Sequence, residues 1–188
     1  MKVGVLSLQG AVEEHLDLIR RCGFEAIKVK TIEDLEKVEK LIIPGGESTT
    51  IGKLARIYNL DEAIIKKGRE GMPIYGTCAG MILLAKEIQD SRQIGFNLID
   101  IVVGRNAFGR QIDSFEVDLK IEGLTEKPFR AVFIRAPYIK KIGKEVKVLA
   151  KFNGKIIMAQ QKNILVSSFH PELTDDLRVH KYFLDKNL

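Results

Sequence analysis

One cysteine of this sequence stands in a pattern suited to nucleophilic catalysis. Residues 76–80 read Gly-Thr-Cys-Ala-Gly, between a strand pattern at residues 73–76 and a helical pattern that begins at Ala79. In a strand-to-helix turn, this spacing is typical of a nucleophile elbow, which holds the central side chain above the edge of a sheet. The free N–H groups at the start of the helix favour a negative charge there. The pattern predicts that Cys78 is a nucleophile, and the alternative is a buried free cysteine that only packs.

A cysteine nucleophile needs a general base, and the base needs a group that orients it. His170 follows a strand pattern and is trailed by Pro171 and Glu172. The proline stiffens the turn, so the imidazole and the carboxylate can face the same side. The order Cys, His, Glu predicts a catalytic triad, and the alternative is a strand-end histidine with an unrelated acid nearby. His15 and His180 belong to helical patterns in charged surroundings, so we expect both at the surface.

A glycine-rich segment offers a place for the negative charge that such a reaction develops. Residues 44–50 read Pro-Gly-Gly-Glu-Ser-Thr-Thr and follow a short strand pattern. Consecutive glycines let backbone N–H groups approach a ligand closely, and a helix capped by Ser48 adds further donors. The segment therefore predicts an oxyanion hole, and a simple turn is the alternative. A phosphate-binding loop is excluded because the Gly-Lys-Ser/Thr ending is missing.

The first half of the chain alternates strand and helix patterns. Such alternation requires right-handed crossovers, which build a parallel sheet with helices on both faces. We expect strands at residues 3–8, 26–29, 41–43 and 73–76, and helices at residues 11–21, 48–57 and 79–87.

The second half of the chain changes to patterns of antiparallel structure. Apolar and charged residues alternate over residues 115–121, which predicts a strand with one wet face. Asn153-Gly154 between two apolar runs is a strong hairpin signal. We expect paired strands at residues 146–152 and 155–159, a strand at 164–168 and a helix at 175–184. The predicted fold is α/β: a three-layer α/β/α sandwich, mainly parallel, with an antiparallel extension beyond about residue 100.

Composition excludes several classes of protein. A chain of 188 residues favours one domain spanning residues 1–188. The net charge is +5, but basic and acidic residues are interleaved, as in residues 33–40, so we expect no nucleic-acid partner. The longest apolar runs fall far short of the ~20 residues of a membrane span. The chain begins in a strand-like run without a signal-peptide core, and two cysteines make neither a disulfide framework nor a Cys-rich zinc site. We therefore expect a cytoplasmic protein without a membrane or metal site, in which Cys22 only packs.

Together these segments resemble the triad-type, class I glutamine amidotransferases. Further segments narrow the resemblance to the glutaminase subunits of two-component pyridoxal 5′-phosphate synthases, and it covers essentially the whole chain. Ala107 stands where serine is more usual in that family. The segments that carry the narrower resemblance are Leu-Gln-Gly-Ala-Val-Glu-Glu-His at 8–15, Pro-Gly-Gly-Glu-Ser-Thr-Thr at 44–50, Arg-Asn-Ala-Phe-Gly-Arg-Gln at 105–111, Phe-Ile-Arg-Ala-Pro at 133–137 and Ser-Phe-His-Pro-Glu-Leu at 168–173.

The resemblance implies hydrolysis of L-glutamine to glutamate and ammonia through a glutamyl thioester. Cys78 would attack the side-chain amide, His170 would move the proton, and Glu172 would hold the imidazole. The oxyanion would be held by the backbone N–H groups of Gly46 and Ala79. The resemblance also implies a set of substrate-binding residues: Gly46, Glu47, Ser48, Arg105, Ile134 and Arg135.

The resemblance implies a protein partner as well. Glutaminases of this type deliver ammonia to the synthase subunit and are weak until they dock on it. We expect docking at Gln9 and Gly10, with a peptide flip in the neighbouring Gly45-Gly46 loop that completes the oxyanion hole. Pyridoxal phosphate is expected as the partner's product, so no cofactor is expected here. The alternatives are the glutaminase of another amidotransferase such as imidazole glycerol phosphate synthase, a peptidase of the same superfamily, or a non-catalytic assembly or regulatory module.

Overall fold

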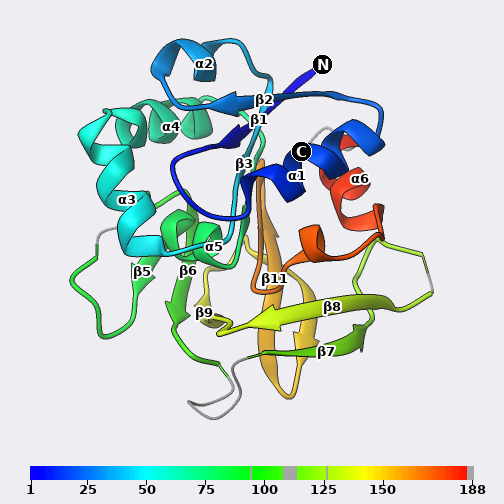
Figure 1. Ribbon diagram of the computed structural model, residues 1–188. Coiled ribbons are helices and arrows are strands. Elements are labelled where there is room, and N and C mark those ends of the chain that lie inside the picture. The colour runs from blue at the N-terminus through cyan, green and yellow to red at the C-terminus, as the bar shows by residue number, and fades with distance from the viewer. Residues whose placement is uncertain (94, 108–113, 126, 186–188) are drawn as a thin grey trace.

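A central twisted sheet of 10 strands organises the molecule (Figure 1). The computed structural model describes residues 1–188 except 94, 108–113, 126 and 186–188. The strands are β1 Lys2–Leu6, β2 Glu25–Val29, β3 Lys40–Ile43, β4 Ile74–Thr77, β5 Ala85–Ile88, β6 Ile99–Gly104, β7 Ser114–Leu119, β8 Phe129–Ile134, β9 Tyr138–Ile142, β10 Lys147–Phe152, β11 Lys155–Gln161 and β12 Ile164–Ser167. The helices are α1 Val12–Arg21, α2 Ile32–Glu36, α3 Ser48–Ile57, α4 Leu60–Arg69, α5 Ala79–Leu84, the 3-10 turn η1 Pro171–Leu173 and α6 Arg178–Asp185.

The strand order confirms the predicted mixed topology. The order in the sheet is β2-β1-β3-β4-β12-β11-β9-β6-β5, with β10 paired to β11. The strands from β2 to β12 in this order are all parallel, whereas β11, β9 and β6 continue the sheet with antiparallel pairings. β7 and β8 form a separate antiparallel pair. The predicted hairpin is also present, since Asn153 and Gly154 both have positive φ, 46° and 74°, as a tight two-residue turn requires.

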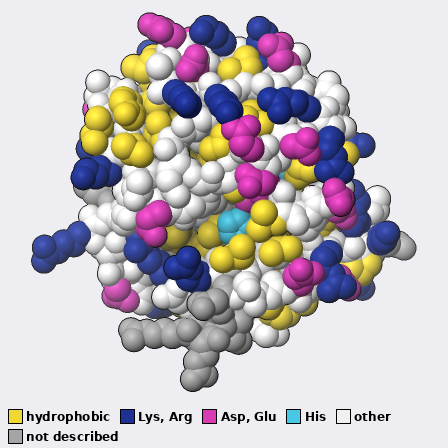
Figure 2. All heavy atoms as spheres, in the orientation of Figure 1, with side chains coloured by type: hydrophobic (Ala, Val, Ile, Leu, Met, Phe, Trp, Pro, Cys, Tyr) yellow, Lys and Arg dark blue, Asp and Glu magenta, His cyan; other side chains and the backbone are white. Residues whose placement is uncertain are grey.

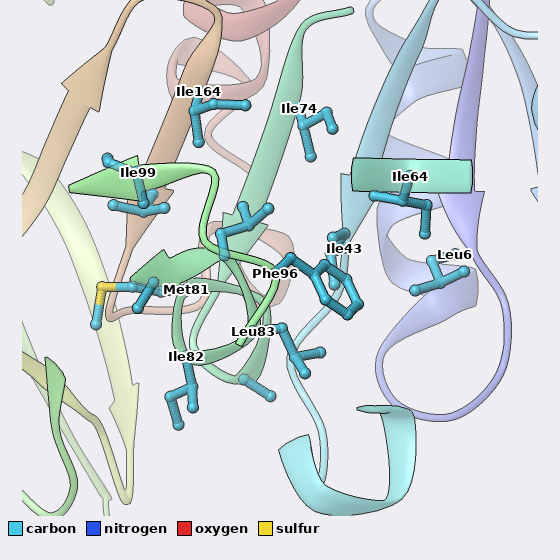
Figure 3. Close-up of a cluster of buried hydrophobic side chains, with 14 of the residues drawn as sticks. Leu6, Ile43, Ile64, Ile74, Met81, Ile82, Leu83, Phe96, Ile99 and Ile164 are labelled. Atoms are coloured by element: carbon cyan, nitrogen blue, oxygen red, sulfur yellow. The ribbon is translucent and has the colours of Figure 1, made fainter. Parts of the chain in front are cut away.

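Successive residues of the central strands face two apolar cores on opposite sides of the sheet. On β3, Leu41 and Ile43 belong to one core and Ile42 to the other. The first core is covered by α3, α4 and α5, and Figure 3 shows part of it, with isoleucines from β3, β4 and β12 among the labelled side chains. The second core is covered by α1, α6 and the β7–β8 pair. This arrangement confirms the three-layer α/β/α architecture.

The helix predicted at residues 79–87 is too long. α5 ends at Leu84, and the chain continues as the edge strand β5, which pairs with β6. The backbone explains this, because the carbonyls at the end of α5 are taken by residues 96–98: Phe96 N–H donates to Leu83 O at 2.6 Å and Leu98 N–H to Leu84 O at 3.0 Å. Lys86 and Glu87 are both exposed between buried neighbours, which breaks the alternation of a regular strand, and the pairing with β6 shifts register between Ala85 and Glu87.

Two other predicted boundaries change. Ser48 does not cap α3: Glu47 occupies the capping position without a side-chain hydrogen bond, and Ser48 is the first helical residue. Its hydroxyl instead donates to Gln93 Oε1 at 3.2 Å. α6 begins at Arg178, later than predicted. The Arg178 N–H at its start donates to Asp176 Oδ1 at 3.0 Å.

The surface agrees with a mixed-charge reading of the sequence. On the face seen in Figure 2, Lys and Arg side chains are interspersed with Asp and Glu, and no patch of one sign dominates. Within the described residues, no helix is both long and apolar enough to cross a membrane.

Candidate active site

Three neighbouring strands bring the predicted chemical groups to one edge of the sheet. β3, β4 and β12 lie side by side and run parallel. Their carboxyl ends therefore meet, at the edge where open α/β sheets bind ligands. The glycine-rich loop follows β3, Cys78 follows β4, and His170 follows β12. The Cys78 N–H donates to Ser167 O at 2.8 Å, which ties the ends of β4 and β12 together.

The turn around Cys78 has the geometry of a nucleophile elbow. Cys78 has φ 49° and ψ −100°, a backbone conformation that few residues other than glycine adopt. The flanking glycines are required by close packing. A Cβ on Gly76 would lie 2.5 Å from the Gly80 carbonyl carbon, and one on Gly80 would lie 2.1 Å from Ile43 O. The sequence pattern at residues 76–80 is thus explained by β4 running directly into α5 against β3.

His170 and Glu172 are joined in a buried pair beside Cys78. His170 Nδ1 lies 2.7 Å from Glu172 Oε1, and the Glu172 side chain is fully buried. Burial disfavours a charge on His170, but hydrogen bonds with Cys78 and Glu172 outweigh it and raise the pKa of His170 to about 10. Burial alone would raise the pKa of Glu172, yet the neighbouring His15 and His170 hold that pKa below its usual value. The site therefore favours an imidazolium between a carboxylate and a cysteine sulfur.

A pocket of about 460 Å³ opens above Cys78. Nearly every residue predicted for the site lines this pocket. The exceptions are Glu172, which is buried and contacts His170, and Gly10. Ile82, Asn106 and Pro137 were not predicted individually, although the last two lie inside the motifs at 105–111 and 133–137. Of the first of these motifs, residues 108–111 lie outside the described residues. The pocket is lined by Gln9, Gly46, Glu47, Ser48, Cys78, Ala79, Ile82, Arg105, Asn106, Ile134, Arg135, Pro137 and His170.

One wall of the pocket carries a guanidinium group fixed by an amide. Arg105 Nη2 donates to Gln93 Oε1 and lies 3.4 Å from Ser48 Oγ. Gln93 Nε2 donates to Ser48 O at 3.0 Å, so Gln93 orients both residues. Sequence reasoning missed Gln93 because a single glutamine in a loop carries no distinguishing pattern.

The loop that contains Gln9 and Gly10 holds the glycine-rich loop in place. The Ala11 N–H donates to Gly45 O at 3.0 Å, and Gln9 Oε1 accepts from the Glu47 N–H at 2.7 Å. In a trans peptide the carbonyl and the next N–H point in opposite directions. The Gly46 N–H is therefore directed away from the Ala11 N–H. The backbones are in close contact, since a Cβ on Gly10 would lie 1.9 Å from Gly45 O.

The β7–β8 pair closes another side of the site. The His170 N–H donates to Val132 O of β8 at 2.8 Å. Ile134 ends β8, and its carbonyl oxygen lies 4.0 Å from Cys78 Sγ. Arg135, the next residue, is exposed and has φ 41°, a left-handed conformation that turns the chain sharply at the pocket wall.

The expectation that His15 and His180 lie at the surface is wrong. Both residues are fully buried. His15 Nδ1 lies 3.0 Å from His180 Nε2, and His15 Nε2 lies 3.2 Å from Thr77 Oγ1 and 3.4 Å from Glu172 Oε2. The helical spacing could have indicated this, because His15 shares the buried face of α1 with Ile19, one turn later. The charged neighbours that suggested exposure lie on the other faces of these helices.

Burying two histidines makes the protein sensitive to acid. Burial lowers the pKa of both His15 and His180, that of His180 to about 3. Below pH 6.5 the unfolded chain binds a proton at His180 that the folded chain excludes, so stability falls as the pH drops from 6.5 towards 3. Between pH 6.5 and 5, His180 alone is expected to cost about 2 kcal/mol of unfolding free energy.

Urea denaturation of the wild type and His180→Gln across this pH range isolates the contribution of His180. The difference in unfolding free energy between the two proteins should change with pH in the direction given, in favour of His180→Gln at low pH. Parallel curves for the two proteins would contradict the assignment.

Comparison with known proteins identifies the family. A model of the SNO glutamine amidotransferase family matches residues 5–188. The chain belongs to this family. It is 59% identical over 186 residues to "Pyridoxal 5'-phosphate synthase subunit PdxT" of Pelotomaculum thermopropionicum, covering 99% of this chain and 95% of the relative. A protein of the same name from Carboxydothermus hydrogenoformans is 56% identical over 186 residues, covering 99% of this chain and 97% of that relative.

Solved structures of similar proteins share the fold of this chain. A crystal structure of a glutamine amidotransferase is 50% identical, superposes with a TM-score of 0.93, and covers 97% of each chain. The structure of PurLQS from Thermotoga maritima has a TM-score of 0.74 at 18% identity, covering 98% of this chain and 97% of that one, and shows the shared fold alone. Across the described ranges, no group of three or more His, Cys, Asp or Glu side chains is arranged to hold a metal ion.

Proposed function

We propose that this family member hydrolyses L-glutamine to L-glutamate and ammonia at Cys78. The Cys78 sulfur attacks the side-chain amide carbon, and the oxyanion is stabilised by the N–H groups of Gly46 and Ala79. His170 transfers its proton to the leaving ammonia, and a glutamyl thioester remains on Cys78. His170 then takes a proton from water, which attacks the thioester and releases glutamate and the sulfur. Glu172 orients the imidazole and balances its charge throughout.

One observation carries this proposal. The floor of the pocket joins Cys78 in an elbow conformation to a buried His170–Glu172 pair with a 2.7 Å contact, in a chain of the glutamine amidotransferase family. Packing alone explains neither the positive φ of Cys78 nor a carboxylate buried against an imidazole.

The walls of the pocket suit the two charged ends of free glutamine. We assign the substrate's α-carboxylate to Arg105, because a guanidinium group matches a carboxylate in shape and charge. Glu47 supplies a carboxylate for the α-ammonium group, and Gly46, Ser48, Ile134 and Arg135 complete the binding surface.

Arg105→Ala is expected to raise KM for glutamine by about 10- to 100-fold while kcat changes far less. A lost charged hydrogen bond costs about 1.5–3 kcal/mol, and binding the same group in ground and transition states affects KM alone. Steady-state glutamate release measures both constants. Arg92→Ala is the matched control, because Arg92 is a nearby exposed arginine that does not line the pocket. An unchanged KM in Arg105→Ala would remove Arg105 from the binding site.

We propose further that the ammonia goes to the synthase subunit of a pyridoxal 5′-phosphate synthase in the cytoplasm. The proposal is supported by relatives of that name that align with nearly the whole chain. A reducing compartment would also keep the Cys78 thiol available. Glutamate release from glutamine should rise when the cognate synthase subunit is added, and amide ¹⁵N from labelled glutamine should enter pyridoxal phosphate.

The same experiment decides between the alternatives. Glutamate release without transfer of ¹⁵N to the synthase product would indicate the glutaminase of another amidotransferase. No release by folded protein in a confirmed complex would leave a peptidase of the same superfamily or a non-catalytic assembly or regulatory module.

Gln9 and Gly10 are the proposed docking contacts, because their segment holds the glycine-rich loop. Gln9 Oε1 accepts from the Glu47 N–H, and the N–H of the next residue, Ala11, donates to Gly45 O. In this proposal the partner moves the loop and flips the Gly45-Gly46 peptide to complete the oxyanion hole, which requires breaking the hydrogen bond from the Ala11 N–H to Gly45 O. Gln9→Ala is expected to reduce the synthase-stimulated rate by about 5- to 10-fold, the effect of losing a hydrogen bond of about 1–1.4 kcal/mol, with a smaller change in the unstimulated rate. Equal stimulation of Gln9→Ala and wild type would contradict docking at this loop.

A further inference from the structure

The proposed triad continues into the protein beyond Glu172. Glu172 Oε1 contacts His170, whereas its other oxygen, Oε2, lies 3.4 Å from His15 Nε2. His15 in turn contacts His180 at 3.0 Å. All of these side chains are buried, and they come from α1, η1 and α6. Neither distant histidine has a role in the proposed chemistry.

The protons in this chain of contacts can be assigned. Burial lowers the pKa of His15 and of His180, so both rings are neutral at neutral pH. An ionised Glu172 only accepts, so His15 Nε2 carries its proton; this N–H has Thr77 Oγ1 as its hydrogen-bond partner at 3.2 Å and Glu172 Oε2 beside it at 3.4 Å. His15 Nδ1 must then accept from His180 Nε2–H. This leaves His180 Nδ1 as an unprotonated acceptor, and that atom is among the buried ones without a hydrogen-bond partner in the described residues.

This arrangement gives His15 a fixed direction. His180 Nε2 contacts His15 Nδ1 and Thr77 Oγ1 contacts His15 Nε2. The carboxylate oxygen that His170 does not use lies 3.4 Å from the same Nε2. Glu172 Oε2 makes no hydrogen bond in the described part of the chain, and His15 Nε2 lies within ion-pair distance of it at 3.4 Å. A buried carboxylate oxygen without a polar neighbour favours rotation or protonation of the group. Either change would remove the support of the His170 imidazolium.

We propose that His15, anchored by His180, is a positioning residue of the glutaminase: it holds the second oxygen of Glu172 so that the first stays aligned with His170. The proposal rests on the proposed function of the site. The titratable groups that face His15 are Glu172 and His170 near η1, His180 on α6 and Glu14 on its own helix, and Tyr75 lies beside His180.

Two variants that replace the His15 imidazole by a side-chain amide, at two different lengths, test this role. In His15→Gln the amide nitrogen can reach the position of Nε2, whereas in His15→Asn it ends near the position of Nδ1 and cannot reach Glu172. We expect His15→Asn to lower kcat for glutamate release by about 10- to 100-fold with KM within about twofold. We expect His15→Gln to keep at least about a third of the wild-type kcat.

The reactivity of Cys78 gives a readout that does not need glutaminase activity. In a Cys22→Ala background, iodoacetamide alkylates Cys78 alone among the cysteines. We expect His15→Asn to slow alkylation at pH 7 by about 10-fold and to make the rate rise with pH, because the imidazolium partner of the sulfur is no longer supported. His15→Gln should retain the wild-type pH profile.

Three outcomes would overturn the proposal. Wild-type kcat and alkylation in folded His15→Asn would show that Glu172 needs no second support. Equal loss in Asn and Gln variants of unchanged Tm would also contradict it, because the loss would not follow the Nε2 donor. If His15→Asn does not fold, His180→Phe must slow alkylation of Cys78, and wild-type reactivity there would exclude the chain of contacts. If the wild type releases no glutamate, the proposed function is overturned instead. The alkylation rates would then still test whether His15 positions Glu172.

Discussion

Replacing Cys78 by alanine is expected to reduce glutamate release from glutamine by at least about 10⁴-fold, in the presence and absence of the synthase subunit. Without the sulfur no thioester can form, and the remaining oxyanion donors and binding contacts support only a small residual rate. The fold should survive, because alanine retains the Cβ of a side chain that fills little space at the pocket floor. Steady-state rates with purified protein measure the effect.

The second cysteine supplies the control for this prediction. Cys22 lies at the C-terminal end of α1, outside the pocket lining, and is only half-buried. Cys22→Ala should therefore retain the wild-type rate. Substantial glutamate release by Cys78→Ala, or its loss in a folded Cys22→Ala protein, would contradict the assignment of the nucleophile.

Replacing Gly80 by alanine is expected to destabilise the protein by about 3 kcal/mol, among the largest effects of adding one methyl group to this chain. The new Cβ would lie 2.1 Å from the carbonyl oxygen of Ile43, a backbone atom of β3 that cannot rotate away. α5 and β3 would have to separate, and Cys78 would move with the start of α5. For a chain of this size the melting temperature should fall by about 6–12 °C.

A helical glycine elsewhere provides the matched control. In α3, a Cβ on Gly52 would meet the end of the Leu83 side chain at 3.1 Å, and a side chain can shift where backbone cannot. Gly52→Ala should change stability by less than about 1 kcal/mol, because alanine also favours helix. Equal melting temperatures for Gly80→Ala and wild type would show that the elbow is not packed as described.

The parts of the site that depend on local turn chemistry could be predicted from the sequence. The elbow at 76–80 and the glycines at 45–46 have short patterns that only a few backbone geometries explain, and they follow strands whose apolar runs are clear. The order of elements also predicted that these turns share one edge of a parallel sheet. The sequence alone therefore predicts that Cys78 and His170 lie at the same edge of the sheet.

The parts that depend on tertiary contacts could not be predicted in this way. α5 ends at Leu84 because distant residues 96–98 take its last carbonyls, and nothing in residues 79–87 encodes that. Gln93 reaches the pocket only because its loop returns beside Ser48. The charged sequence neighbours of His15 predict exposure, whereas His15 and its helical neighbour Ile19 are both fully buried.

Labelling with a glutamine-analogue electrophile tests the central claim most directly. The diazoketone 6-diazo-5-oxo-L-norleucine places its ketone carbon where the amide carbon of glutamine would lie, and the neighbouring diazomethyl carbon alkylates the cysteine sulfur with loss of dinitrogen. With the synthase subunit present, we predict one adduct per chain, located on Cys78 by peptide mass spectrometry, slowed by excess L-glutamine, retained in Cys22→Ala and absent from Cys78→Ala. Labelling that glutamine does not slow, that resides on Cys22, or that persists in Cys78→Ala would contradict Cys78 as the nucleophile of a glutamine-binding site.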